Sequence, residues 1–146
     1  MDFRAMAEAV QPEVVAFRRD LHEHPEASFQ EFRTTEQIAK EMDKLGIPYR
    51  RFEPTGLIAE IKGGKPGKTI ALRADIDALS ITEKTGLPFA SKNDGFMHAC
   101  GHDTHAAMLV GAAKVLMQVK DQLCGTVKLL FQPAEEIGRG AKAVIQ

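Results

Sequence analysis

The stretch 105–132, HAAMLVGAAKVLMQVKDQLCGTVKLLFQ, decides the fold class because it places a long helix directly before a strand. Residues 105–119 carry apolar side chains at helical spacing, and residues 125–132 form a short apolar run that Pro133 ends. A similar apolar run, residues 68–75, precedes the helix. This alternation of strands with a helix predicts an α/β domain with a mixed or largely parallel sheet.

The N-terminal half adds two helices to this prediction. Residues 13–23 have helical apolar spacing, and Pro12 is expected in the first turn, where its missing N–H is tolerated. Residues 30–45 are predicted as an amphipathic helix with Phe32 on its apolar face. Two short strands are expected next, at residues 47–53 and 56–63.

Two segments lack a regular pattern. Residues 76–101 show no clear periodicity, and a loop of that length in a compact domain is usually either functional or a misassigned helix or strand. Residues 62–69, KGGKPGKT, end like a phosphate-binding loop, but Lys62 stands where such a loop needs glycine, and a strand follows instead of a helix. We therefore predict a hairpin turn there.

Composition bounds the class of protein. The chain has 146 residues, which suits one domain, with 44% hydrophobic and 27% charged residues. A net charge of −1 argues against a nucleic-acid partner. No apolar run approaches the roughly 18 residues that cross a membrane, and charged residues interrupt any signal peptide. Two cysteines make no disulfide framework, so a reducing cytoplasm is expected.

Residues 96–108, FMHACGHDTHAAM, concentrate three of the five histidines beside a cysteine. Asp103 is a candidate N-cap of the helix that follows, so Cys100 and His102 would lie at its positive end, where a thiol pKa is lowered. Cysteine-x-histidine spacing differs from that of structural zinc sites. A thiol nucleophile normally meets its histidine across the fold. The remaining interpretation is an open metal site in which His105 supports the ligands. A thiolate and an imidazole suit Zn²⁺, Co²⁺, Ni²⁺ or Mn²⁺.

Two pairs of carboxylates are candidates for the same site. Asp75 and Asp77 follow the strand at 68–75 and share a face if the chain stays extended, although such a pair is common without function. Glu135 and Glu136 follow the strand at 125–132. On a loop, one glutamate can bind a metal while its neighbour faces the metal-bound water. In isolation, an exposed acidic turn is the better explanation of the second pair.

One further motif has a plain interpretation. HEH, residues 22–24, lies where Pro25 stops a predicted helix, and histidine is favoured near a helix C-terminus. We interpret it as a helix end.

Four motifs in order resemble those of the M20 metallopeptidase superfamily, in its amidohydrolase branch of N-acyl-amino-acid amidohydrolases and hippurate hydrolases. They are FRRDLHEHPE (17–26), LRADIDAL (72–79), GFMHACGHDTHAAMLVGAAKVL (95–116) and KLLFQPAEEIGRGAKAVI (128–145). The resemblance implies a three-layer, zinc-peptidase-like catalytic domain, of which residues 1–146 are the N-terminal portion. It also implies that two further histidine ligands, one soon after PAEE and one near the C-terminus of family members, and a smaller lid domain that covers the site and mediates dimerisation, lie outside this chain.

The resemblance assigns a role to each candidate residue. Cys100, His102 and Glu136 would bind one or two divalent ions, and Glu135 would be the general base. The supporting residues would be Asp75, Asp77, Asp103 and His105, with Asp75 ranked above Asp77.

The implied reaction is the hydrolysis of the amide bond of an N-acyl amino acid to a carboxylate and a free amino acid. Residues 1–146 alone are expected to be inactive and to self-associate, whereas the full-length enzyme is expected to be a homodimer. Alternatives are an aminoacylase, an N-acetyl-diaminopimelate deacetylase, a dipeptidase, or a non-catalytic metal-binding module.

Overall fold

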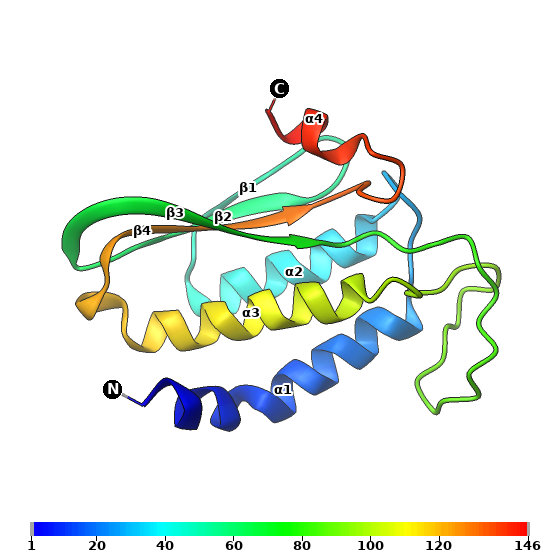
Figure 1. Ribbon diagram of the computed structural model, residues 1–146, viewed down its shortest axis with the longest axis horizontal. Helices are drawn as coiled ribbons and strands as arrows, with labels where there is room; N and C mark the ends of the chain where they lie inside the picture. The colour runs from blue at the N-terminus through cyan, green and yellow to red at the C-terminus, as the bar shows by residue number, and fades with distance from the viewer. Residues whose placement is uncertain (1, 146) are drawn as a thin grey trace.

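The computed structural model describes residues 2–145 and places three long helices on one side of a four-stranded sheet (Figure 1). The helices are α1 (Phe3–Glu23), α2 (Phe32–Leu45), α3 (His102–Gln118) and the short α4 (Gly140–Ile145), with a 3₁₀ turn η1 (Lys120–Gln122). The strands are β1 (Tyr49–Arg51), β2 (Leu57–Lys62), β3 (Lys65–Asp75) and β4 (Cys124–Gln132). Each predicted helix and strand is therefore present, with shifted bounds.

The sheet has the strand order β1-β2-β4-β3. β2 is antiparallel to both β1 and β4, whereas β3 and β4 are parallel. Two parallel neighbours need a crossover, and α3 supplies it by packing across one face of the sheet (Figure 1). The predicted α/β class with a mixed sheet is confirmed.

The turn that joins β2 to β3 differs from the prediction. A hairpin was expected, but the two strands do not pair with each other, because β4 lies between them. Gly63 and Gly64 instead cross the start of β4, where the N–H of Gly63 donates to the carbonyl of Gly125. A Cβ on Gly63 would clash with the carbonyl oxygen of Leu123. The glycines thus serve a close backbone crossing and not a hairpin.

Two details of the helices also correct the prediction. α1 begins at Phe3, so Pro12 lies inside the helix and not in its first turn. Phe32 is 60% exposed, although it was expected on the apolar face of α2. The buried stripe of α2 instead runs through Glu31, Thr35, Ile38 and Met42, at spacings of four, three and four residues. Phe32 lies one residue, about 100° of helix rotation, away from that stripe.

The core fills the space between the sheet and the inner helices. Ile38 and Met42 of α2 and Val110 of α3 pack against alternate residues of the central strands, including Leu129 and Phe131 of β4. α1 contacts α3 and covers it on the side away from the sheet (Figure 1). Within residues 2–145, no helix combines the length and the apolar character that a bilayer crossing requires.

Three motif-bearing segments meet at one end of the sheet. β3 ends at Asp75 and β4 ends at Gln132, which are partners in the parallel register. α3 begins at His102 beside those strand ends (Figure 1). The topology therefore gathers the carboxylates and the His-rich stretch at one place, as expected for the C-terminal ends of parallel strands.

Candidate metal centre

Cys100, His102 and Glu136 offer three metal-binding atoms within 4.8 Å of one another. Cys100 precedes α3, His102 begins it, and Glu136 lies on the loop after β4. Thiolate, imidazole and carboxylate are the donors that zinc-like ions accept at open sites. The structure thus brings together the three residues predicted as ligands.

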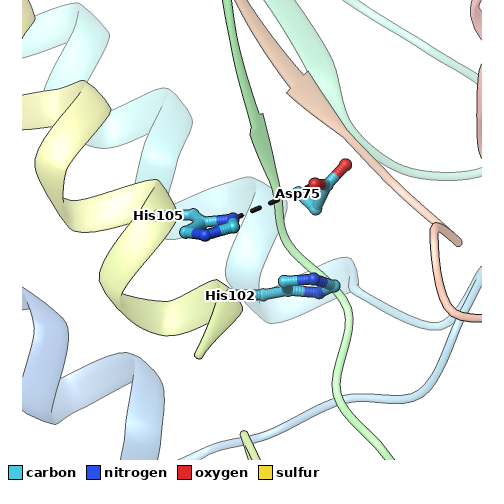
Figure 2. A group of neighbouring side chains, drawn as sticks. All are labelled: Asp75, His102 and His105. Carbon is cyan, nitrogen blue, oxygen red and sulfur yellow. Dashed lines mark ion pairs between the residues drawn. The ribbon is translucent and has the colours of Figure 1, made fainter. Parts of the chain in front are cut away.

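A second group shares His102 with the first. Asp75, His102 and His105 also present donor atoms within 4.8 Å of one another (Figure 2). Asp75 Oδ2 lies 3.9 Å from His105 Nδ1, while its Oδ1 accepts hydrogen bonds from the guanidinium of Arg73 at 2.8–2.9 Å. Asp75 is thus turned toward Arg73 and His105, and His105 is half-exposed.

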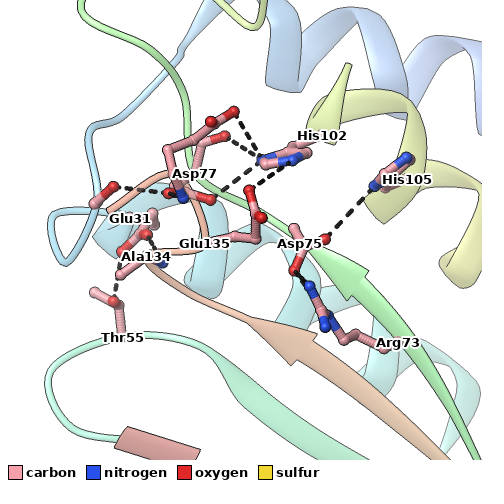
Figure 3. A network of polar contacts seen from close by, with 11 residues as sticks. Glu31, Thr55, Arg73, Asp75, Asp77, His102, His105, Ala134 and Glu135 are labelled. Atoms are coloured by element: carbon pink, nitrogen blue, oxygen red, sulfur yellow. Dashed lines mark hydrogen bonds and ion pairs between the residues drawn. The ribbon is translucent and has the colours of Figure 1, made fainter. Parts of the chain in front are cut away.

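His102 is held in one orientation by Asp77. Its Nδ1 donates to the backbone carbonyl of Asp77 at 2.9 Å and lies 3.2 Å from Asp77 Oδ1 (Figure 3). Nε2 is left facing Glu135, whose Oε2 is 3.6 Å away. Burial alone would lower the pKa of His102, but the hydrogen bonds to Asp77 and the charges of Asp77 and Asp75 raise it to about 9. Metal binding would displace the proton that these groups stabilise.

Asp77 connects three segments through one buried carboxylate. Its Oδ2 accepts hydrogen bonds from Ser28 Oγ at 2.7 Å and from the backbone N–H of Glu136 at 3.0 Å. Burial raises the pKa of Asp77, but its hydrogen bonds outweigh burial and keep the pKa below its ordinary value. Asp77 is therefore the carboxylate that hydrogen-bonds His102, whereas Asp75 is paired with Arg73.

Asp103 does not cap α3 as predicted. The N-cap residue is Gly101, in the left-handed region, and no side chain caps the helix. Asp103 lies in the first turn and points at α1, where its Oδ2 is 2.7 Å from Arg18 Nε and 2.8 Å from His22 Nδ1. His22 also lies 3.1 Å from Glu83 on the long loop. Asp103 thus ties the start of α3 to the end of α1.

The environment of Cys100 also differs from the expected one. The neighbouring Glu136 carboxylate, loss of hydration, and the charges of Glu135 and Asp75 raise the pKa of the Cys100 thiol. The helix terminus was expected to lower this pKa, but the carboxylates outweigh it. Within residues 2–145, Glu136 Oε1 is buried without a hydrogen-bond partner. Clustered negative groups with an unpartnered buried oxygen fit a cation, which would reverse the effect on the thiol.

The adjacent glutamates take different directions. The Glu136 side chain is mostly buried near Cys100 and His102. The Glu135 side chain, in contrast, is 38% exposed and lies beside His102 Nε2 (Figure 3). Ala134 before them has a φ of +50°, in the left-handed region. This irregular backbone lets neighbouring side chains face one ligand site from two sides.

Two buried residues that were not predicted to belong to the site lie near it. His98 is 4% exposed, neither ring nitrogen has a hydrogen-bond partner among the described residues, and burial lowers its pKa to about 4. Glu31 is fully buried and bonds to the loop that carries Glu135 and Glu136. The signal for Glu31 was its place on the buried stripe of α2; His98 offered none beyond its neighbours.

Residues 71–146 match the family described as Peptidase family M20/M25/M40. The chain belongs to this family. The M20 resemblance that the four motifs predicted is confirmed.

Similar proteins extend this result along the chain. An N-acetylcysteine deacetylase of Bacillus subtilis is 54% identical and covers 91% of this chain and 36% of its own length. An N-acyl-L-amino acid amidohydrolase of Geobacillus stearothermophilus is 43% identical, and the match covers 99% of this chain and 40% of that relative. A Bacillus subtilis crystal structure described as a dinuclear metal binding peptidase of the M20 family aligns with a TM-score of 0.91 at 53% identity, with 94% and 39% covered. The chain spans between a third and two fifths of these relatives.

Proposed function

We propose that the protein hydrolyses the amide bond of N-acyl amino acids with the help of one or two divalent metal ions. The observation that carries the proposal is the convergence of Cys100, His102 and Glu136, with Glu135 beside them and Glu136 Oε1 unpartnered. Relatives named as an N-acetylcysteine deacetylase and an N-acyl-L-amino acid amidohydrolase support the substrate class.

The residues of this chain would have separate roles in metal binding, proton transfer and ligand orientation. Cys100, His102 and Glu136 would hold the ion, which when bound supplies a Lewis acid and lowers the pKa of water. Glu135, partly exposed beside the donor set, accepts the proton of the attacking water and returns it to the leaving nitrogen. Asp77 holds His102 so that Nε2 faces the site. Zn²⁺, Co²⁺, Ni²⁺ and Mn²⁺ all suit these donors.

The further proposals concern a longer protein of the length of the relatives. We propose that residues 1–146 form the N-terminal portion of its catalytic domain, that further ligands come from elsewhere, and that this portion alone has no measurable turnover. The complete enzyme is proposed to be a cytoplasmic homodimer that acts on a small molecule, without a nucleic-acid or membrane partner. Residues 1–146 alone are proposed to self-associate, which light scattering across a concentration series tests.

Metal analysis tests the donor set directly. The chain is loaded with Zn²⁺ or Mn²⁺, dialysed and measured by elemental analysis, beside Cys100→Ser and His102→Ala. Both substitutions are expected to reduce the bound metal. Metal content unchanged in both variants would refute the donor set, independently of any activity.

A second candidate is peptide hydrolysis. A relative named thermostable carboxypeptidase 1, from Saccharolobus solfataricus, is 49% identical over 91% of this chain. Amide and peptide bonds need the same water activation, so the metal site does not separate them. Comparing N-acetyl amino acids with dipeptides as substrates of the complete enzyme decides between the two.

A further inference from the structure

Glu31 is a buried carboxylate that neither the metal site nor the core explains. It is 0% exposed and lies at the N-cap of α2, on the stripe that faces the sheet. Among residues 2–145 it forms no ion pair with Lys, Arg or His within 4.0 Å. A carboxylate buried without a cation destabilises a fold unless its oxygens are hydrogen-bonded. Its hydrogen-bond partners therefore indicate its purpose.

Both oxygens of Glu31 have specific partners. Oε2 accepts a hydrogen bond from Thr55 Oγ1 at 2.6 Å, and Oε1 accepts one from the backbone N–H of Ala134 at 2.8 Å (Figure 3). Burial raises the pKa of Glu31, and these two bonds partly offset that effect. One of the two partners is thus the residue directly before Glu135 on the loop that follows β4.

The Ala134 bond acts at a strained point of the loop. Ala134 has a φ of +50°, a conformation that residues with a Cβ rarely adopt. The carbonyl of the same residue accepts the N–H of Gly140 at 3.0 Å, which closes the loop. The conformation therefore needs outside support, and Glu31 supplies it at the amide.

A second bond holds the loop on the other side of Glu135. The N–H of Glu136 donates to Asp77 Oδ2 at 3.0 Å, so two buried carboxylates bind the amides that flank Glu135. Glu31 and Asp77 come from different segments of the chain, at the start of α2 and after β3. Between them they fix the backbone from which both glutamate side chains project.

We propose that Glu31 is a positioning residue that, through the Ala134 amide, sets where Glu135 and Glu136 stand relative to Cys100 and His102. The proposal rests on the metal function proposed for that loop. It adds a residue of α2, more than 100 positions away in sequence, to the machinery that prepares the site.

The test compares three substitutions at Glu31 with one matched control in the full chain. Glu31→Leu keeps most of the volume and removes both acceptors, whereas Glu31→Gln keeps an acceptor for Ala134. Glu31→Asp keeps the charge but is one methylene shorter. The control is Glu41→Gln, a buried carboxylate of the same helix that pairs with Lys44 and Lys114 and does not contact the loop.

The first measurement is amide hydrogen exchange of the metal-free chain. Glu31→Leu is expected to accelerate exchange in residues 133–140 at least tenfold, while β2 and β4 stay protected. Glu31→Gln and Glu41→Gln should leave this loop at the wild-type rate. Equal loop exchange in Glu31→Leu and wild type would overturn the proposal.

The second measurement is a Co²⁺ titration that follows the thiolate-to-cobalt absorption of Cys100. Loss of an outer residue that orients ligands typically weakens metal binding about 10- to 100-fold, and this is expected for Glu31→Leu. A Co²⁺ Kd in Glu31→Gln that stays within about threefold of the wild-type value separates positioning from general destabilisation. A Kd in Glu31→Leu equal to the wild-type value overturns the proposal. If Glu31→Leu does not fold, the same two measurements are made on Glu31→Asp. Loop exchange and a Co²⁺ Kd equal to those of the wild type in Glu31→Asp would overturn the proposal. If the wild-type chain bound no Co²⁺, the metal function would fail, and the exchange measurement would still decide the role of Glu31.

Discussion

Replacing Asp77 with Asn is expected to release His102 from its charged partner. The pKa of His102 is about 9, against about 6.5 for an ordinary imidazole, and burial opposes this rise while Asp77 is the main cause of it. The difference corresponds to roughly 3 kcal/mol of preference for the imidazolium. In Asp77→Asn the pKa of His102 should therefore fall to about 6.5 or below in the metal-free chain.

The sign of the stability change follows from the same shift. A pKa raised on folding stabilises the metal-free chain fully below about pH 6.5, and this contribution disappears as pH rises through about 9. Asp77→Asn should thus lower the free energy of unfolding by up to about 3 kcal/mol near pH 6 and by much less near pH 10.

Two assays measure these effects. An NMR titration of the His102 ring, with chelator present, gives the pKa, and urea unfolding at pH 6 and pH 10 gives the stability difference. The matched control is Asp75→Asn, because Asp75 also raises the pKa of His102 but is itself paired with Arg73. The assignment of Asp77 as the orienting group would be refuted by a His102 pKa that stays near 9 in Asp77→Asn. It would also be refuted if the His102 pKa fell by more in Asp75→Asn than in Asp77→Asn.

Three further predictions follow from single contacts. Phe131→Ala removes a fully buried ring of β4 and should lower the free energy of unfolding by about 3–5 kcal/mol, as measured in urea; a loss below about 1 kcal/mol would contradict its place in the core. Asp103→Ala leaves Arg18 and His22 without their shared buried partner, so a loss of about 3 kcal/mol and faster amide exchange in α1 are expected; unchanged exchange there would show that the contact does not hold the helix. Glu135→Gln in the complete enzyme should lower kcat about 10²- to 10⁴-fold with bound metal unchanged; wild-type kcat would exclude Glu135 as the base.

Local patterns predicted the elements of this fold well. The helical spacing of residues 105–119 and the apolar runs at 68–75 and 125–132 correspond to α3, β3 and β4. The bounds moved by a few residues at most, except in α1, because residues 3–12 have too few buried side chains to show the pattern. Local preference and final structure agree wherever a segment buries one clear face.

Pairing between distant segments could not be predicted in the same way. Consecutive strands are usually neighbours, so the turn at 62–69 indicated a hairpin, yet β4 inserts between β2 and β3. Asp103 carried a plausible capping signal, but Arg18 and His22 on α1 hold it more strongly than the helix end does. In both cases a partner far away in sequence outweighs the local preference.

In the candidate site, too, some features could be predicted from local motifs and others depend on contacts between distant segments. The set Cys100, His102 and Glu136 was implied by the resemblance of the motifs, and the structure brings these residues together where the ends of β3 and β4 lie beside the start of α3. The order of importance of Asp75 and Asp77 depends on which carboxylate meets His102 in space, and only the structure supplies that. Glu31 was overlooked because an acid on a helix is normally assigned to the exposed face.

The three bonds of Asp77 make distant parts of the sequence interdependent. Ser28, His102 and Glu136 come from separate segments of the chain, yet each contacts the same buried carboxylate. Substitutions at Ser28 and His102 should therefore not combine additively, since each changes how the other shares Asp77, whereas Glu136 donates its backbone N–H, which a side-chain substitution keeps. A change in the segment of Ser28 is then tolerated only in combination with particular residues in the segment of His102, so variants selected one segment at a time would miss combinations that work together.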